Sequence, residues 1–439
     1  MKSLLAIFIS RIRGNCCLPL CVALLCLTLQ SSAQQRDLSF YQNTAHQNNP
    51  AIKENTNLQQ YNVLQNDFTL AQFRKPQLNF TADYLFAPFF SNNGQVISIT
   101  SNPDSKAFGY NAGLTNGGLY AAQLNASVPL ITGKIVNSYF KQTSIQNRLL
   151  KNENLKLIHE LDKNVSDQYI TAYQIQQEVG YLQKIIFLVA DRKKIVEALV
   201  QKGLMQQNDF LLLEVEINSR KYDIQQQKIA LSNAFSQLND ICGISDTTNY
   251  SLAIPVVNQT QRLQQFNYEQ KFQLDSLNIV AQQEVFNTKY RPQVSAYGNT
   301  GLNAAEANSI PHSIGMSAGL HLYIPIYDGS LKKTVEQQNK LLMQNTQQYN
   351  RTTAVRIQNN LTNVQQQINL TNQSLSLLND QLSTQETLLK ILKDKVVIGQ
   401  VSVTDYLIAI QNYAETNKNK IQAQAGLLLL INQYNYVNW

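Results

Sequence analysis

The residue types that support catalysis are few in this chain and lie far apart. The four histidines are His46, His159, His312 and His321, and none lies within one or two helical turns of another. His159 is followed by Glu160, but the second histidine that a zinc-binding helix requires is missing. The sequence contains no phosphate-binding loop and no nucleophile elbow. We therefore expect a protein that is not an enzyme and has no resident metal or cofactor.

Cysteine chemistry is equally restricted. Residues 1–33 are predicted to be a secretory signal peptide, with basic residues first, an apolar run at 18–29 and a small-residue cleavage site at 31–33. Four of the five cysteines lie in this segment. Cys21 and Cys26 each follow a leucine, which argues against a lipoprotein. The mature chain would retain only Cys242, which we interpret as a small buried side chain.

The composition argues against nucleic-acid binding and against a membrane-spanning helix. The net charge of +7 falls to about +4 once residues 1–33 are removed, which is too weakly basic for nucleic acid. After residue 33, no apolar run approaches the roughly 20 residues that span a bilayer as a helix. If the mature chain meets a membrane, we expect it to do so through β-strands.

Two aspartates with a fixed spacing reveal an internal repeat. Asp209 recurs 196 positions later as Asp405, and Gly203 recurs at the same offset as Gly399. The segment from Pro129 to Gly133 likewise recurs as Pro325 to Gly329. Each half carries about 70 residues of almost unbroken helical pattern, which at 1.5 Å per residue makes a helix roughly 100 Å long.

Four segments alternate between apolar and polar residues with the period of a β-strand: 76–87, 119–131, 292–303 and 313–327. A soluble antiparallel sheet with one wet face has the same alternation. The signal peptide and the long helices favour a transmembrane barrel instead. Because four strands cannot close a barrel, several chains would have to combine. A dimer would give eight strands and a trimer twelve, and the pattern alone leaves both possibilities open.

The remaining segments are predicted to be helices that end at glycine or before proline. Long helices at 135–200 and 331–396 carry apolar residues in steps of three and four, as in coiled coils. Return helices follow at 206–240 and 404–432, and shorter helices at 50–72 and 268–288 precede Pro76 and Pro292. The predicted domains are residues 34–240 as first repeat, 241–266 as linker or equatorial segment, and 267–439 as second repeat.

These motifs resemble the TolC-type outer-membrane efflux proteins over essentially the whole mature chain. The matching segments are Asn48 to Ile52, Lys75 to Leu78, Val128 to Gly133, Arg291 to Val294, Ile324 to Gly329 and the two glycine turns. The resemblance implies a mixed α+β membrane protein, a trimeric 12-stranded β-barrel with four strands per chain. The barrel would continue into a long α-helical coiled-coil barrel in the periplasm.

The resemblance also implies two sets of site residues. The periplasmic tip, which would form the gate and contact an adaptor, comprises Gly203, Leu204, Asp209, Gly399, Gln400 and Asp405. The junction between barrel and tunnel comprises Pro76, Pro129, Gly133, Pro292, Pro325 and Gly329. Where better-known members carry a latch of tyrosine and arginine, this chain has Val396 and Val401. Asp405 could form a charged constriction in a three-fold ring or simply stabilise the start of its helix.

The function implied by the resemblance is a passive conduit, the exit duct of a tripartite efflux or type I secretion system. Its expected partners are two further copies of the chain, a periplasmic adaptor (membrane fusion) protein, an inner-membrane pump of the RND or ABC type, and outer-membrane lipid. The expected location is the outer membrane of a Gram-negative bacterium. The alternative is a secreted trimeric coiled-coil structural protein or adhesin without channel activity.

Overall fold

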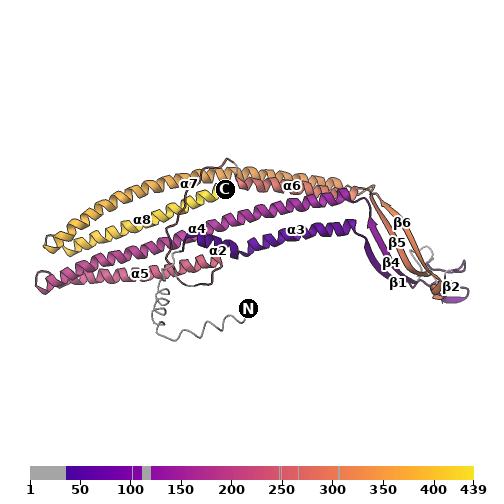
Figure 1. Ribbon diagram of the computed structural model, residues 1–439, viewed down its shortest axis with the longest axis horizontal. Helices are drawn as coiled ribbons and strands as arrows, with labels where there is room; N and C mark the ends of the chain where they lie inside the picture. The colour runs from indigo at the N-terminus through magenta and orange to yellow at the C-terminus, as the bar shows by residue number, and fades with distance from the viewer. Residues whose placement is uncertain are drawn as a thin grey trace, which may run out of the picture. The chain divides into compact units, whose positions relative to one another are not determined.

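The computed structural model describes residues 36–439 except 101, 111–119, 247, 249, 265 and 305–306. The predicted signal peptide, residues 1–33, lies outside the described residues. The helices are α2 (Leu38–Asn48), α3 (Pro50–Arg74), α4 (Gly133–Gln201), α5 (Gln207–Cys242), α6 (Asn267–Asn287), α7 (Leu331–Val397) and α8 (Val403–Val437). The strands are β1 (Gln77–Tyr84), β2 (Phe89–Asn92), β3 (Gln95–Ser98), β4 (Tyr120–Pro129), β5 (Gln293–Ala304) and β6 (Ile314–Tyr323). Short 3-10 helices occupy Thr288–Tyr290 and Ala307–His312, and Figure 1 labels the main elements.

The chain forms two compact units that cut across the predicted repeats. Among the described residues, one unit takes those within 36–49, 158–262 and 360–438, and the other takes those within 50–157 and 263–359, with Trp439. The repeat boundaries at 240 and 267 stay a prediction, and each unit takes segments from both halves of the sequence. The reason is the length of α4 and α7, with 69 and 67 residues, because each helix contributes to both units.

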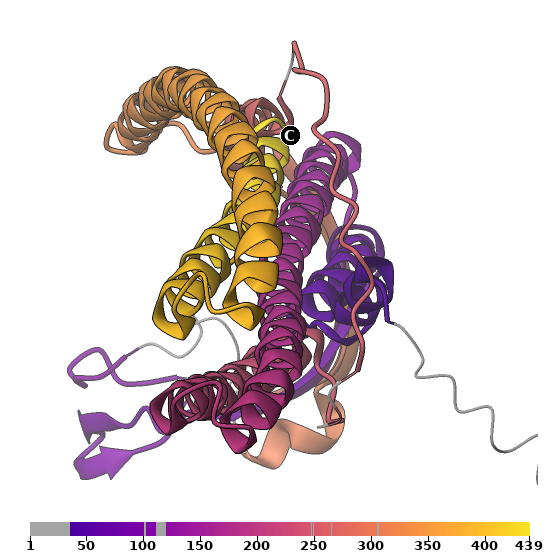
Figure 2. The same cartoon turned by 90° about the vertical axis from the view of Figure 1, so that its left-hand side faces the viewer.

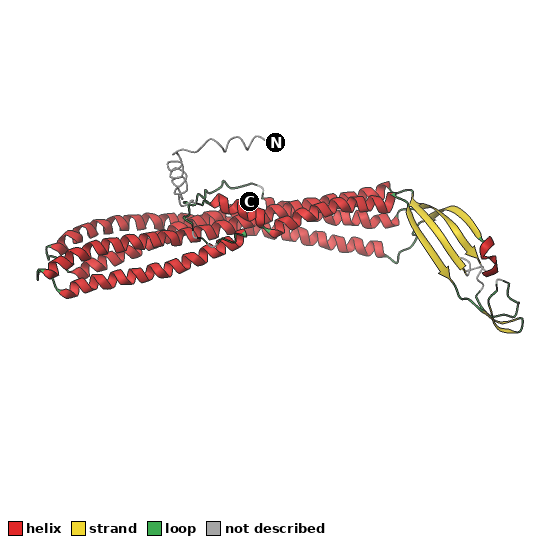
Figure 3. Ribbon diagram, turned by 60° about the horizontal axis from the view of Figure 1, so that its bottom comes forward, coloured by secondary structure: helices red, strands yellow, loops and turns green. Residues whose placement is uncertain are grey.

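The second unit contains a four-stranded antiparallel sheet in the order β1-β4-β5-β6 (Figure 3). The pairing register places apolar residues beside one another across the sheet, as in the row Ala82, Ala122, Leu302 and Ile314. The alternate rows are polar, as in Asn79, Asn125, Asn299 and Ser317. The sheet therefore has one apolar and one polar face, as the period-two alternation predicts.

The polar face is tied together by side-chain hydrogen bonds between strands. Asn125 Nδ2 donates to Thr81 Oγ1 at 2.9 Å, and Ser317 Oγ donates to Asn299 Oδ1 at 2.9 Å. His321 lies on this face, opposite Ser295. The apolar face is exposed: Phe80 is 69% exposed and Met316 87%.

The first unit contains two helical hairpins, α4–α5 and α7–α8. Figure 2 faces their turns and shows the orange and yellow α7–α8 pair beside the magenta α4–α5 pair. Both hairpins bury apolar residues in one cluster, which includes Val189, Val196, Leu213, Leu407 and Ile410. Val189, Leu407 and Ile410 belong to the predicted stripe and return helix, whereas Val196 and Leu213 lie in the core outside the predicted set.

Several elements differ from the predicted bounds. Strand β1 ends at Tyr84, and β6 ends at Tyr323 because Pro325, two residues on, cannot donate to a sheet. Helix α5 continues to Cys242, where Gly243 ends it in the left-handed conformation (φ 64°). Helix α8 continues to Val437. Helix α2 and the hairpin of β2 and β3 were not predicted.

Candidate functional site

The two predicted tip turns have the same backbone geometry. Gly203 and Gly399 have φ angles of 70° and 71°, in the left-handed region that glycine adopts without strain. The amide of Gly203 donates to the carbonyl of Val200 at 2.9 Å, and that of Leu204 donates to Leu199 at 2.8 Å. This is the Schellman arrangement, which satisfies the last carbonyls of a helix.

The turn at Gly399 has the same two backbone hydrogen bonds as the turn at Gly203. Gly399 N donates to Val396 O at 3.2 Å, and Gln400 N donates to Lys395 O at 3.0 Å. Leu204 and Gln400 are both exposed, as are the two glycines. The predicted tip residues are thus placed at two equivalent helix ends within one compact unit.

Asp209 and Asp405 each stabilise the start of a return helix. The Asp209 carboxylate accepts a hydrogen bond from the backbone amide of Gln206 at 3.3 Å. Ser402 Oγ accepts from the backbone amide of Asp405 at 3.0 Å and donates to its Oδ2 at 2.7 Å. A carboxylate in the first turn also interacts favourably with the helix dipole. The helix-start role is therefore a structural fact for both residues, and a gate role for Asp405 would have to be additional to it.

Arg192 is a buried cation beneath these turns, and the sequence analysis missed it. Its side chain is 1% exposed, and its guanidinium carbon lies 5.7 Å from the centroid of the Tyr406 ring. Burial raises the pKa of the Tyr406 hydroxyl. The contact joins α4 to α8, and Tyr406 directly follows Asp405 in the sequence. The signal that could have found it is positional: Arg192 falls between Val189 and Val196, where the apolar stripe requires another apolar residue.

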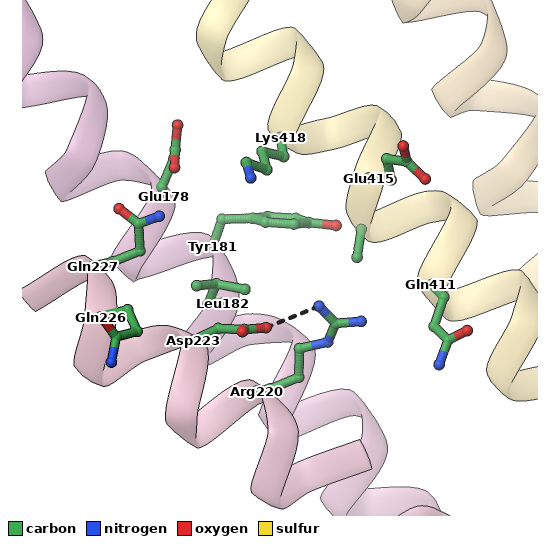
Figure 4. Close-up of a pocket in the computed structure, with 11 residues that line it drawn as sticks. Glu178, Tyr181, Leu182, Arg220, Asp223, Gln226, Gln227, Gln411, Glu415 and Lys418 are labelled. Atoms are coloured by element: carbon green, nitrogen blue, oxygen red, sulfur yellow. Dashed lines mark hydrogen bonds and ion pairs between the residues drawn. The ribbon is translucent and has the colours of Figure 1, made fainter.

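A polar contact joins the two hairpins in the same unit. Glu216 on α5 is buried and accepts from Arg220 Nε at 2.7 Å through one oxygen and from Gln411 Nε2 on α8 at 2.9 Å through the other. Arg220 also donates through Nη1 to Asp223 at 3.1 Å, the dashed line in Figure 4. The carboxylate of Glu216 is thus paired on both oxygens, which a buried charge requires.

A cavity of about 460 Å³ adjoins this contact. Figure 4 shows Tyr181 and Leu182 entering it from α4, Arg220 from α5 and Lys418 from α8. The Tyr181 hydroxyl donates to the Tyr413 carbonyl at 3.3 Å, and burial raises its pKa. The cavity leaves space beside the polar contact, so the two hairpins are bonded here without being close-packed.

The predicted junction residues lie at the ends of the sheet strands, but the two halves differ in geometry. Pro76 and Pro292 each directly precede a strand, and Pro129 is the last residue of β4. Gly133 opens α4 and is not among the positive-φ residues, whereas Gly329 has a φ of 67°. The equivalence of these two glycines in sequence does not extend to the backbone.

Asp328 forms several hydrogen bonds at the second junction, beside Gly329. Its carboxylate accepts from the backbone amides of Ser330 at 3.0 Å and Lys332 at 2.8 Å, at the start of α7. The Tyr290 hydroxyl also donates to it, which holds the pKa of Asp328 below its usual value and raises that of Tyr290 to about 12. The segment before β5 is thereby bonded to the segment after β6.

Other chemistry-bearing residues do not assemble into a site. Among the described residues, no three histidine, cysteine, aspartate or glutamate side chains are grouped as metal ligands would be. His46 bonds to Asp162 at 2.7 Å, and His159 bonds to the carbonyl of Tyr436 at 2.9 Å. Within the same residues, no helix is long and apolar enough to cross a membrane.

Comparison with known proteins identifies the fold. No protein-family model and no curated protein matches the sequence. Among solved structures, the outer membrane protein VceC of Vibrio cholerae superimposes with a TM-score of 0.66 over 91% of this chain and 95% of its own, at 11% identity. The chain has the fold of an outer-membrane channel.

Two further channels have the same arrangement. The CmeC outer membrane channel of Campylobacter jejuni matches with a TM-score of 0.68 and 13% identity, over 91% of this chain and 85% of its own. The open state of the MtrE outer membrane channel of Neisseria gonorrhoeae matches with a TM-score of 0.66 and 13% identity, over 91% and 88%. The α+β fold expected from the resemblance to TolC-type proteins is confirmed.

Proposed function

We propose that this chain is the outer-membrane exit duct of a tripartite efflux or type I secretion system. It would act as a passive conduit in the outer membrane of a Gram-negative bacterium, with its helices in the periplasm. The observation that carries the proposal is the four-stranded sheet. Its apolar face is exposed in the single chain and its polar face is hydrogen-bonded, which suits contact with lipid on one side and water on the other.

The sheet also supports a trimer. Strands β1 and β6 are the sheet edges within the chain, and unpaired edges are not viable in lipid. Pairing β1 of one copy with β6 of the next would close the sheet, and three copies would give the twelve-stranded barrel expected from the resemblance. The equivalent hydrogen bonds at Gly203 and Gly399 support the internal repeat, which would put six similar helix turns around the trimer axis.

The tip turns are the proposed gate and adaptor contact. Leu204 and Gln400 are exposed beside the glycines, where a periplasmic adaptor could reach them. The adaptor would link the duct to an inner-membrane pump of the RND or ABC type, which supplies the energy. Opening would separate the α4–α5 and α7–α8 hairpins, and the Arg192–Tyr406 and Glu216–Gln411 contacts would oppose it.

Membrane fractionation tests the proposal. The full chain, expressed with its N-terminal segment, should be recovered from outer membranes as a heat-resistant trimer. Deletion in the native cell should abolish export of at least one cargo and leave the adaptor and pump in place. Recovery as a secreted soluble trimer would instead support the structural or adhesin alternative and contradict the duct.

A further inference from the structure

The polar face of the four-stranded sheet is made almost entirely of uncharged side chains. Asp83 is the only aspartate, glutamate, lysine or arginine in β1, β4, β5 and β6, although charged residues make up 15% of the whole chain. It lies at the end of β1, one residue before the strand stops. His321, opposite Ser295, is the only histidine in these strands. The polarity of this face therefore comes from amides and hydroxyls.

A row of neutral hydrogen-bonding side chains crosses the face. The row consists of Asn79, Asn125, Asn299 and Ser317, one from each strand. An amide offers both donors and an acceptor, and a hydroxyl offers one of each kind. Such a row can exchange hydrogen bonds with water or with a polar solute whatever the charge of the solute. Three copies of the chain would repeat this row around the bore of the proposed barrel.

Tyr297, in the neighbouring row, lies against the sheet. A Cβ built on Gly319, its partner on β6, would come within 2.6 Å of the Tyr297 hydroxyl oxygen and 2.7 Å of its Cζ. The tyrosine ring thus extends over Gly319 and occupies space that only glycine leaves free. A large side chain on the polar face is accommodated here without standing out from the sheet.

Two common arrangements of a wet face differ from this one. On ordinary soluble proteins, much of the surface polarity comes from charged side chains such as lysine and glutamate. Channels that select ions by sign place rings of charged side chains in the pore. The four strands show neither arrangement along the polar face.

We propose that the polar face lines a charge-neutral outer section of the duct, through which polar solutes of either charge pass without ion pairing. The inference rests on the proposed function, because this face lines a bore only in the closed barrel. A cleft lined by one sign of charge concentrates the opposite ion, whereas a neutral lining favours neither sign. Selection of cargo by charge then belongs to the tip or to the partner pump.

Thiol reagents of opposite charge measure the potential at this face. Asn299→Cys and, separately, Ser317→Cys are introduced into the full chain in outer-membrane vesicles. The rates of modification by a cationic and an anionic methanethiosulfonate are compared in about 10 mM salt, where screening is weak. The ratio of the two rates cancels the reactivity of the thiol itself. Cys242 is buried and its pKa is raised to about 12, so it should add no background.

Both cysteine variants should show the ratio of free 2-mercaptoethanol within about twofold. Because the reagents carry opposite unit charges, a local potential of about one kT would change the ratio about sevenfold. Leu320→Cys on the apolar face should react with neither reagent, since lipid would cover it. Gln123→Glu, one row from Asn299 on the same face, should shift the ratio of Asn299→Cys several-fold toward the cationic reagent.

The outcomes separate the neutral lining from the proposed function. A larger departure from the free-thiol ratio, with Leu320→Cys unreactive, would overturn the neutral lining and leave the proposed function standing. Reaction of Leu320→Cys as fast as Asn299→Cys would contradict both, as would no reaction at Asn299 and Ser317. Absence of a shift in Gln123→Glu would show a face open to bulk water and also contradict both. Each variant is first checked for the oligomeric state of the unmodified chain, and the two cysteine positions provide independent readings.

Discussion

At the scale of single residues, two glycines set the geometry of the proposed gate. An alanine at Gly203 or Gly399 would have to adopt the left-handed conformation at a cost of about 1–2 kcal/mol. We predict that Gly399→Ala lowers the unfolding temperature, measured by circular dichroism, and that Gly203→Ala has a similar effect. Gly133→Ala is the matched control: an added Cβ meets no atom within 4 Å and the residue lacks positive φ. An equal loss in all three variants would refute this account of the turns.

The buried cation at Arg192 is predicted to cost stability. Its Nε has no hydrogen-bond partner, and burying an incompletely satisfied charge is unfavourable. Arg192→Met keeps most of the volume and should leave the unfolding temperature unchanged or raise it. Arg192→Ala should lower it through the cavity it leaves. The exposed neighbour Lys194 provides the control, since Lys194→Met should change stability by less than about 0.5 kcal/mol. Strong destabilisation by Arg192→Met would show that the charge itself stabilises the fold.

The bond between Tyr290 and Asp328 predicts a specific pH dependence. The pKa of Asp328 is lowered chiefly by this bond, so its contribution to stability is present above the unfolded value of about 3.9 and is lost as pH falls. The pKa of Tyr290 is raised to about 12, so its contribution is present below about pH 10 and is lost between pH 10 and 12. Tyr290→Phe should weaken both dependences in equilibrium unfolding. Tyr222→Phe, at an exposed position on α5, should change neither.

At the scale of elements, the strands, the long helices and the glycine turns could be predicted because each is encoded locally. Alternation indicates a strand, three–four spacing indicates a helix, and glycine permits the left-handed turn. The hairpin of β2 and β3 was missed although Asn93-Gly94 signals one, because its strands have only four residues each. Arg192 was missed because its burial depends on which helix packs over it, and the sequence of α4 does not show this. For Asp209 and Asp405, the sequence left open whether they stabilise a helix start or form a gate. The hydrogen bonds in the structure establish the helix-start contacts.

The two hairpins are predicted to separate when the tip opens. Glu216→Cys and Gln411→Cys place thiols on α5 and α8 where the native side chains are hydrogen-bonded. Joining them with a short bifunctional maleimide should block export while leaving assembly intact. Cys242 is buried and its pKa is raised to about 12, so it should remain unmodified. The double variant without reagent, and each single variant with it, are the controls. Unimpaired export by the cross-linked protein would exclude hairpin separation as the opening step.

For the whole molecule, we propose that one chain provides only part of the channel wall. The exposed apolar face, the two sheet edges and the many exposed apolar residues of α7 have no covering element among the described residues of a single chain. In the proposed trimer, lipid would cover the sheet face and neighbouring chains would cover the sheet edges and helix faces. Stability should therefore depend on assembly, and the full chain should not persist as a compact monomer.

The most direct test is to measure the mass of the purified full chain in detergent and, on the same sample, the permeability of liposomes that contain it. We predict three copies per particle and release of small polar solutes that increases when the Glu216–Gln411 contact is removed by Gln411→Ala. A stable monomer that leaves the liposomes sealed, with or without Gln411→Ala, would contradict it.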